Sequence, residues 1–525
     1  MFLKNLIEKI NPYAALERQK ASMQLEYLKK VQNSGYSEGG ASRRKNALKG
    51  FRAESYSPLE DIDVNLDLLR QRSRTLFMTS PIAASAIKLN RTSIIGAGLR
   101  LKCRIDSQTL GLTQQQAEQQ AEQWERNTER EFALWASSKH CDTLGLNDFY
   151  ELQSIALVSW LLNGDCFVLI DYEKPSPFMP YTLRLHLIEG DRVSNPHSYG
   201  GYVSLNQKTE NGNRIFNGIE VDQKGKVVAY HICNTYQNGS IAVKKEWVRV
   251  KATGENTGLP NVLHIMEAER PEQYRGVPYL APIIVVLRQL TQYTEAELMA
   301  AVINGIFSVF ITTKNGEESV GFDGSVDDSQ KVYDTSGDYQ LGAGMINYLA
   351  PEEDIKVADA TRPNVNFDTF ATAMCKYIGA ALEIPYEVLI KAFSNNYSAS
   401  RAALLELWKY IKMRRSWFVN DFCQPIYELF LTEAVANSRI QAAGFFSNPA
   451  IKFAWCRAEW NGPAQGQLDP VKEVTAAKIR VEQGFSTRER ETVEINGGDF
   501  NGNINQAEME NEKMIQSGLK NEVGI

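Results

Sequence analysis

Two apolar helical segments on either side of a polar insertion constrain this chain more than any other feature. The first runs from about residue 278 to 304, directly after the turn YRGVP, and the second covers residues 366–382 and ends before Ile384-Pro385. Between them, residues 312–363 are rich in Gly, Asp and Ser, as in NGEESVGFDGSVDDS. Because proline suits the first turn of a helix and breaks its interior, these bounds predict two helices joined by a long polar excursion.

A short polar loop and a long aromatic helix follow. The loop KAFSNNYSAS occupies residues 391–400, and the helix runs from Arg401 to about Val435, with a kink or break at Pro425. Aromatic side chains at helical spacing usually indicate burial in a core, and we expect these to pack the helix against its neighbours. They are Trp408, Tyr410, Trp417, Phe418, Phe422, Tyr427 and Phe430.

The remaining pattern predicts an α+β protein that is mainly helical. Helical periodicity is expected over residues 61–95, with a restart at Pro81, and over the Gln/Glu-rich stretch 114–135. Alternating or β-rich runs predict strands at 166–172 and 181–189 and a hairpin at 217–232. At the C-terminal end, helices are expected at 469–484 and 486–495. An Asn-rich tail, GGDFNGNINQ, and a polar remainder follow, and we expect both to be mobile.

Charge is distributed unevenly along the 525 residues. The net charge is −6, but residues 1–52 hold eleven Lys or Arg against four Asp or Glu, a balance of +7 that leaves −13 for residues 53–525. A protein that grips nucleic acid through its phosphates normally has a basic main body, so DNA would be touched here without being held tightly. An ordinary acidic protein fits the charge equally well.

Short basic elements carry open alternatives. The stretch 34–50 reads as a flexible linker or arm, and its basic end at 43–52 could hold another protein or DNA, or have no partner. The pair Arg414-Arg415 could meet DNA or a neighbouring subunit's carboxylates, although such a pair is most often solvated.

Cysteine usage and hydropathy point to a reducing compartment and no membrane crossing. The seven cysteines are scattered and contain no C-x-x-C pair, which favours buried thiols over disulfides or a zinc site. The N-terminus has charges inside its apolar stretch, unlike a secretory signal. The most apolar segment, residues 299–313, is too short to span a bilayer as a helix.

Motifs for catalysis or cofactor binding are absent from the sequence. Gly96-Ala97-Gly98 lacks the third glycine of a dinucleotide site, and Gly225-Lys226 lacks the first glycine and the hydroxyl residue of a phosphate loop. None of the five histidines has metal-ligand spacing. The acidic run Glu352-Glu353-Asp354 follows a proline and reads as a solvated turn. No enzymatic activity, cofactor or metal is therefore expected.

Several segments, taken in order, resemble the lambda-like portal proteins of tailed phages. The most specific of them is the combination of IPYEVL and NYSASRAA. It is supported by RGVPYLAP, by W-N-G-P with a following D-P-x-K, by IEGDRVSNP and by the hairpin at 217–232. The resemblance covers roughly residues 60–500. It implies that the chain divides into a basic N-terminal arm at 1–52, a wing at 53–277, a stem helix at 278–311, a clip at 312–363, a second stem helix at 364–390, a tunnel loop at 391–400, a long linking helix at 401–419, and a crown and tail at 420–525.

The resemblance also implies a function. Twelve copies would form a ring at one capsid vertex of the virion, assembled in the host cytoplasm. Double-stranded DNA would be packaged and ejected through the ring. The ring would dock the terminase large subunit and then the head-tail adaptor proteins. Capsid and scaffold proteins would be further partners. The tunnel-loop residues expected to face DNA are Lys391, Ser394, Asn395, Asn396 and Tyr397.

Composition alone leaves this loop ambiguous, because an ordinary surface loop between helices would look the same. Two other functions stay open at this point. One is another ring-forming virion structural protein without DNA passage, and the other is a DNA-processing enzyme, which would need a metal cluster or a phosphate loop.

Overall fold

The computed structural model describes most of the chain. The described residues are Tyr13, Glu17, 20–26, Asn46, Gly50, 54–112, 115–196, 208–209, 211–236, 243–305, 309–311, 331–332, 346–348, 367–393, 397–466 and 469–517. The chain forms two units, residues 1–57 and 58–525. In the first unit, residues 20–26 are helical, and all elements named below belong to the second.

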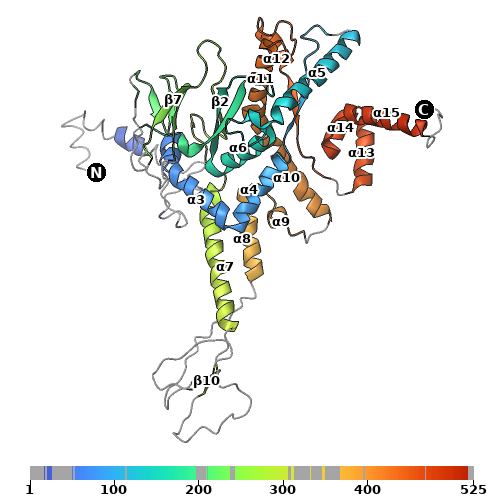
Figure 1. The fold of residues 1–525 in the computed structure, drawn as a ribbon. Helices are drawn as coiled ribbons and strands as arrows, with labels where there is room; N and C mark the ends of the chain where they lie inside the picture. Colours follow the sequence, from blue (N-terminus) through green and yellow to red (C-terminus); the bar gives the residue numbers. More distant parts are fainter. Residues whose placement is uncertain are drawn as a thin grey trace, which may run out of the picture. The chain divides into compact units, whose positions relative to one another are not determined.

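The second unit is an α+β structure dominated by helices, as the sequence predicted (Figure 1). Its α-helices are α3 (Leu66–Thr79), α4 (Pro81–Ile94), α5 (Gln115–Ala136), α6 (Phe149–Asn163), α7 (Ile284–Gly305), α8 (Phe367–Ala381), α9 (Tyr386–Leu389), α10 (Tyr397–Phe418), α11 (Gln424–Ala436), α12 (Pro449–Trp455), α13 (Pro470–Glu482), α14 (Arg488–Asn496) and α15 (Phe500–Gln516). Among these described residues, no helix is both long and apolar enough to span a membrane.

Four small sheets accompany the helices. Their strands are β1 (Arg100–Cys103), β2 (Asp165–Tyr172), β3 (Leu183–Glu189), β4 (Arg214–Phe216), β5 (Ile219–Val221), β6 (Val227–Cys233), β7 (Trp247–Lys251), β8 (Val262–Met266), β9 (Val309–Ile311), β10 (Lys331–Val332), β11 (Ile346–Tyr348) and β12 (Ala458–Asn461). The sheet orders are β3-β2-β8, β4-β5-β6-β7, β1-β12 and β10-β11-β9; the first three are antiparallel and the last is parallel.

Local sequence signals set several helix bounds. Ser80 caps α4 by accepting a hydrogen bond from the Ala83 amide, and Pro81 takes the first position, which confirms the predicted restart. Asp148 and Glu151 form a reciprocal capping box at the start of α6, and Gly164 ends α6 in the left-handed region. The predicted start of the next long helix at 278 was six residues early, because Ala281–Ile283, with Pro282 inside it, forms a 3₁₀ turn before α7.

The core is built on aromatic rings from α5, α6 and α11. Phe132 makes edge-to-face contacts with Phe149, Tyr427 and Phe430, at ring-centroid distances of 5.6, 5.8 and 5.2 Å. Such pairs add to the stabilisation from apolar burial. Phe418, Phe422, Tyr427 and Phe430 are fully buried, so the prediction of core burial is confirmed for these four, whereas Trp417 is partly exposed.

The predicted aromatic helix is divided into three pieces. A π-helical segment, η8 (Val419–Cys423), separates α10 from α11, and Pro425 lies at the start of α11. A π segment leaves backbone groups out of the regular ladder, and Pro425, which has no amide proton, falls just after it. The helix therefore changes type before Pro425 and continues beyond it, so the predicted break at Pro425 is not seen as an interruption of the helix.

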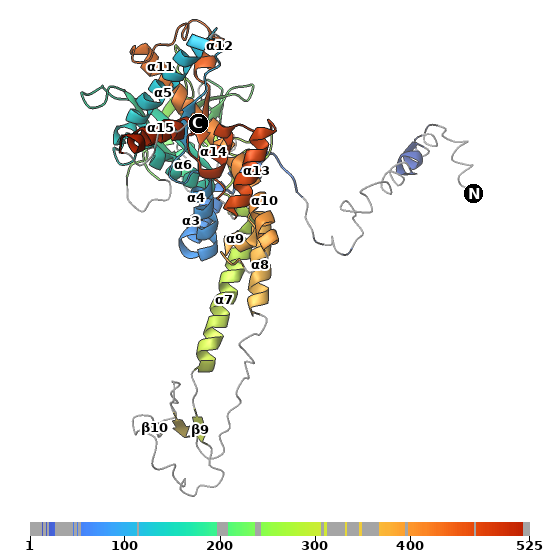
Figure 2. The same ribbon diagram turned by 90° about the vertical axis from the view of Figure 1, so that its right-hand side faces the viewer.

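Helices α7 and α8 pack side by side (Figure 2). The Tyr293 ring lies 5.7 Å from Phe367 and 4.7 Å from Phe370, measured between centroids. Between these helices the structure describes only β9, β10 and β11, so most of the predicted clip at 312–363 lies outside the described residues.

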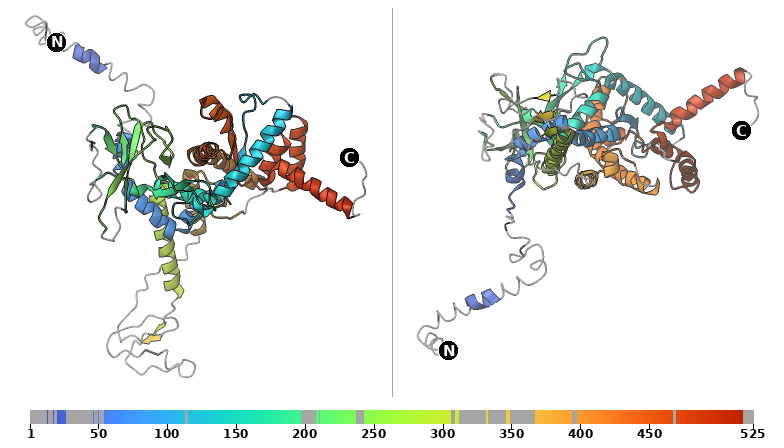
Figure 3. Two further views of the ribbon diagram at one scale, coloured as in Figure 1. Left: turned by 45° about the horizontal axis from the view of Figure 1, so that its top comes forward. Right: turned by 90° about the horizontal axis from the view of Figure 1, so that it is seen from below.

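The predicted mobile tail is wrong in its main part. Residues 500–516 form α15 (Figure 3). Asp499 caps this helix by accepting hydrogen bonds from the amides of Asn501 and Gly502, at 2.9 and 3.3 Å. The Asn-rich composition suggested disorder, but the Asp499 cap satisfies backbone amides at the start of a helix.

Candidate functional site: the base of the loop between α9 and α10

The chain reaches the predicted tunnel loop through a tight turn after α8. The Ile384 amide donates to the Gly379 carbonyl at 2.9 Å, and Glu383 adopts a left-handed backbone conformation with φ +56°. A Cβ atom at Gly379 would lie 2.5 Å from the Ile384 carbonyl oxygen, so only glycine fits here. Pro385 then precedes the single-turn helix α9.

Helix α9 is fastened to the body at its C-terminal end. The Ser85 hydroxyl on α4 donates to the Leu389 carbonyl at 2.8 Å, and the Ala392 amide donates to the Glu387 carbonyl at 2.9 Å. Lys391 follows with φ +57° and an exposed side chain. The loop therefore leaves from a fixed point and not from a flexible stretch.

The structure places only part of the predicted tunnel-loop set. The Lys391 side chain is solvent-exposed at the base of the loop. Ser394, Asn395 and Asn396 lie outside the described residues, and Tyr397 is described only by its backbone, at the start of α10. Their approach to DNA stays a prediction.

Arg414 on α10 contacts the segment that leads into α7, and this segment is in turn bonded to the end of α8. Its guanidinium lies 4.6 Å from the Tyr279 ring centre and 4.7 Å from that of Tyr410, and it forms an ion pair with Glu267 at 3.1 Å. The Tyr279 hydroxyl donates to the Leu382 carbonyl at the end of α8. Burial raises the pKa of Glu267, while Arg414 acts to lower it. This contact set connects α10, the start of α7 and the end of α8.

The expectation that Arg414 and Arg415 are solvated is wrong. Arg414 is buried, and Arg415 donates to the carbonyls of Ser93 and Ile94 on α4 and of Pro463 beyond β12, at 2.8 to 3.0 Å. Both side chains are occupied inside the chain and hold α10 against its neighbours. A sequence reading cannot identify these partners, because they lie far away along the chain.

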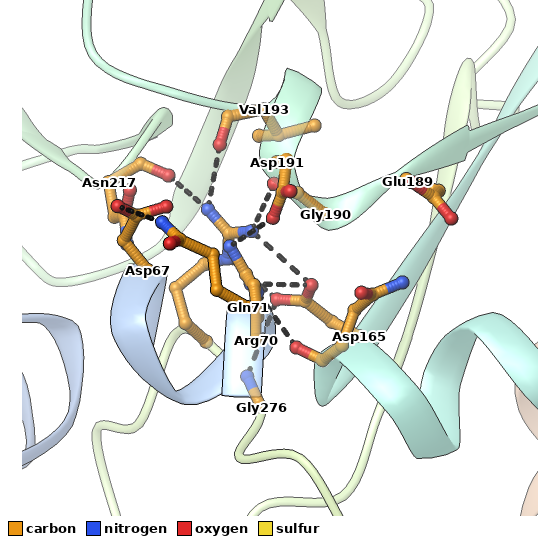
Figure 4. A network of polar contacts seen from close by, with 12 residues as sticks. Asp67, Arg70, Gln71, Asp165, Glu189, Gly190, Asp191, Val193, Asn217 and Gly276 are labelled. Carbon is orange, nitrogen blue, oxygen red and sulfur yellow. Dashed lines mark hydrogen bonds and ion pairs between the residues drawn. The ribbon is translucent and has the colours of Figure 1, made fainter. Parts of the chain in front are cut away.

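A buried charge network fixes the segment that leads into α7 (Figure 4). Asp165, the first residue of β2, accepts from Arg275 Nε at 2.6 Å and from Arg70 Nη2 at 2.8 Å. Arg275 also donates to the carbonyls of Gly190 and Val193 at 2.7 and 2.9 Å. The network therefore connects α3, β2 and the turn before α7 through fully or nearly fully buried groups.

Electrostatics inside the network favour the ionised carboxylate. Burial acts to raise the pKa of Asp165, but the guanidiniums of Arg275 and Arg70 outweigh it and hold that pKa well below its usual range. His264 lies with Nε2 3.6 Å from Asp165 and stacks on Phe167 at 4.2 Å, and its pKa is lowered, chiefly by burial. Both arginines of the network, Arg70 and Arg275, are therefore bound to acceptors within the chain and have a structural role.

Close backbone approach explains the glycine in the turn YRGVP. A Cβ atom at Gly276 would lie 1.8 Å from the Gly164 carbonyl oxygen, and one at Gly164 would lie 2.3 Å from the Gly276 carbonyl oxygen. The two chain segments therefore cross at a distance that only glycine allows. The turn was singled out in the sequence, but its partner at the end of α6 was not.

Among the described residues, no group of three or more His, Cys, Asp or Glu side chains could hold a metal ion. The seven cysteines are all buried and free. The polar groups that are brought together around the loop base position helices and do not form a reaction centre.

The described fold combines a helix pair, a fixed loop base and a long helix that returns to an aromatic core. A family model described as "Phage portal protein, lambda family" matches residues 44–415, and the chain belongs to this family. Portal proteins are structural components of the virion and not enzymes. The predicted family is therefore confirmed.

Curated relatives carry the same name. The chain is 23% identical over 509 residues to "Portal protein B" of Escherichia phage lambda, covering 93% of this chain and 91% of the relative. It is 23% identical over 476 residues to the "Portal protein" of Escherichia phage N15, covering 87% and 86%. A "Probable portal protein" of Halomonas phage phiHAP-1 is 22% identical over 426 residues, covering 79% and 74%.

Solved structures with a similar chain come from gene transfer agent particles. A chain in the "Neck of native GTA particle computed with C12 symmetry" has a TM-score of 0.37 and 14% identity, covering 82% of this chain and 92% of that chain. A chain in the "Neck of empty GTA particle computed with C6 symmetry" has a TM-score of 0.35 and 15% identity, covering 85% and 96%.

Proposed function

We propose that twelve copies of this chain form a ring at one vertex of a phage capsid, through which double-stranded DNA is packaged and later ejected. The ring docks the terminase large subunit during packaging and the head-tail adaptor proteins afterwards. Capsid and scaffold proteins are further partners, with the basic stretch 43–52 as one candidate contact. Family membership and the lambda and N15 relatives support this proposal.

The observation that carries the ring is an apolar surface on α7 and α8 that the chain itself leaves uncovered. Val285, Leu298 and Met299 on α7 and Phe370 and Tyr377 on α8 are exposed although these helices pack against each other. Exposed apolar area costs about 25 cal/mol for each Å² left in water. In a ring, neighbouring copies cover such surfaces, and a heterologous contact that closes produces cyclic symmetry.

The loop composition supports DNA passage. Within residues 391–400, Lys391 carries the only formal charge, and the other side chains are small, polar or aromatic. Each phosphate held by a basic group releases counterions and adds affinity, which would oppose sliding. A loop with few cations would therefore line the channel without binding the DNA phosphates tightly.

Packaging by loop variants tests DNA passage. Asn395→Lys combined with Asn396→Lys is expected to slow or block packaging while rings still assemble, because new cations would grip the phosphates. Asn395→Gln combined with Asn396→Gln, which stays uncharged, is the control and should package normally. Normal packaging by the lysine variant would remove this loop from the DNA path and favour a ring-forming virion protein without DNA passage.

A further inference from the structure

The base of the loop between α9 and α10 carries two opposite charges that the chain leaves unpaired. Glu383 lies directly before the segment 384–390 and Lys391 lies directly after it, and both side chains are exposed. Neither has an ion-pair or hydrogen-bond partner for its side chain among the residues that the structure describes. Glu387, the other carboxylate of this segment, takes part in interactions within the chain. Glu383 is therefore the carboxylate of the loop base that is available to a partner.

Both residues hold an unusual backbone conformation. Glu383 has φ +56° and Lys391 has φ +57°, and in the described part of the chain only five residues other than glycine have positive φ. This left-handed conformation is unfavourable for a residue with a Cβ atom, and it is found where the surrounding structure imposes it, often at functional positions. The two charges are therefore held at defined places, at the two ends of a segment that Ser85 fastens to the body.

A cleft of about 510 Å³ lies beside Glu383, between the end of α8 and the middle of α10. Figure 2 shows where α8, α9 and α10 meet. The walls of the cleft are mainly apolar and are formed by Ala380, Ile384, Pro385, Tyr386, Tyr410 and Met413.

Four charged side chains line this cleft, and three of them are engaged within the chain. Lys409 pairs with Glu406 at 2.7 Å, and the Lys376 ammonium lies 4.8 Å from the centre of the Tyr386 ring. Glu383 is the fourth, so among the described residues the cleft keeps one carboxylate without a partner. Apolar walls with one unpaired carboxylate fit a short segment that combines a cation with an apolar side chain.

The start of the loop has this composition. Lys391 carries the only formal charge of residues 391–400, and Phe393, two residues further on, is 57% exposed. The cleft and this short segment lie on the same part of the chain but differ in charge. Two different and complementary surfaces are what a head-to-tail contact between identical copies requires.

Ring symmetry brings the loop bases of neighbouring copies together. In a ring of twelve, each copy is rotated by about 30° from the next, so equivalent atoms are separated by about half of their distance from the axis. Residues close to the axis are therefore also close to the next copy. With the loop 391–400 around the channel, as proposed above, the segment 391–393 of one copy faces the loop base of the next.

We propose that, in the assembled ring, residues 391–393 of one copy dock in the cleft of the next copy, where Lys391 pairs with Glu383 and Phe393 packs against the apolar walls. The inference rests on the proposed ring and names a contact at its narrowest part. The pairing also neutralises the one cation of the loop, so that Lys391 does not hold the DNA phosphates.

Cross-linking tests the contact between copies. All seven native cysteines are buried, so a short bis-maleimide reacts selectively with cysteines introduced at exposed positions. Two differently tagged chains, one with Glu383→Cys and one with Lys391→Cys, should give a mixed dimer when they are co-assembled into rings. Asp368→Cys in place of Glu383→Cys is the control and should give none, because Asp368 is also exposed but lies at the other end of α8.

Charge reversal provides a second readout. Lys391→Glu and Glu383→Lys should each raise the protein concentration at which rings and monomers are equally populated by about tenfold, because two like charges would meet at every contact. The double variant Lys391→Glu/Glu383→Lys should assemble like the unmodified chain, since the pair is restored in the opposite order. Mass photometry across protein concentrations measures this, and a double variant as weak as the single ones would contradict the pairing.

The aromatic part of the contact is tested separately. Phe393→Ser should weaken ring formation in the same assay, whereas Phe446→Ser, which removes a ring of similar exposure (64%) before α12, should not. Equal behaviour of the two variants would remove Phe393 from the contact.

The outcomes separate the contact from the ring. Rings that give no mixed dimer, or that form equally well after charge reversal, would overturn the contact and leave the proposed function intact. Failure of the unmodified chain to form rings under any condition would overturn the proposed function and this inference together.

Discussion

Asp165 is the shared carboxylate partner of two buried arginines. It receives two arginines from separate parts of the chain, and its own side chain is fully buried. A buried ion pair contributes little compared with an apolar alternative, but removal of one partner leaves the other uncompensated. Without Asp165, Arg275 would keep its carbonyl acceptors and Arg70 would keep the more distant carboxylate of Asp191, at 3.7 Å.

We expect Asp165→Asn to lower the free energy of unfolding by about 3–5 kcal/mol at pH 7, because two buried guanidiniums lose their shared carboxylate. The measurement is urea unfolding followed by circular dichroism. Asp171→Asn, at the exposed end of the same strand, is the control and should change stability little. An unchanged free energy of unfolding in the Asp165→Asn variant would show that the network does not contribute to stability.

The same residue predicts a pH dependence. The pKa of Asp165 is lowered in the folded state, so its contribution is complete above the unfolded-state pKa of about 4 and is lost as the pH falls toward the lower folded-state pKa. The stability gap between the native protein and Asp165→Asn should therefore not shrink between pH 7 and pH 5, where the nearby Asp63 carboxyl, with a pKa raised to about 6 mainly by burial, also titrates, and should shrink below about pH 4. A gap that shrinks between pH 7 and pH 5 would contradict this assignment.

At the scale of elements, local signals in the sequence were sufficient for most helices. The cap at Ser80-Pro81, the proline at 385 and the aromatic spacing around Phe422 each identify an element without any tertiary knowledge. Helix α15 was missed because its composition was weighed more heavily than the Asp499 cap and the four-three spacing of its apolar residues. The charge network and the partners of Arg414 could not be predicted, since they join residues about a hundred or more positions apart.

The turn that leads into α7 gives a prediction at this scale. Gly276→Ala should destabilise the protein by several kcal/mol, because its Cβ would overlap the Gly164 carbonyl and the backbone of α6 would have to move. Gly502→Ala is the comparison. A Cβ atom at Gly502 would lie 3.6 Å from its nearest neighbour, the Cβ atom of Asp499. Because alanine also has a higher helix propensity than glycine, this variant should be neutral or slightly stabilised in thermal unfolding. Tolerance of both substitutions would refute the close crossing of the two segments.

At the scale of the whole molecule, the proposed ring requires contacts between copies. The exposed apolar side chains of α7 and α8 are available for such contacts. The expected assembly of twelve subunits of 59.1 kDa has a mass of about 710 kDa. The regions described as wing, stem, clip and crown stay predictions at this scale, as does the tunnel loop.

Charged substitutions on α7 test this dependence. Leu298→Glu with Met299→Glu should shift the population from rings to monomers, because each ring contact would then bury carboxylates without partners. Gln119→Glu with Gln120→Glu adds the same charge at exposed polar positions of α5 and should leave rings largely intact. Native mass spectrometry distinguishes the two, and equal behaviour of both variants would exclude this face of α7 from the contact.

Electron microscopy of the purified assembly, at a resolution that separates helices, tests the ring and its channel. We expect a closed ring of twelve copies in which residues 391–400 of every copy surround the narrowest part of an axial channel. A self-contained monomer, or a ring whose 391–400 segments lie away from the central opening, would contradict it.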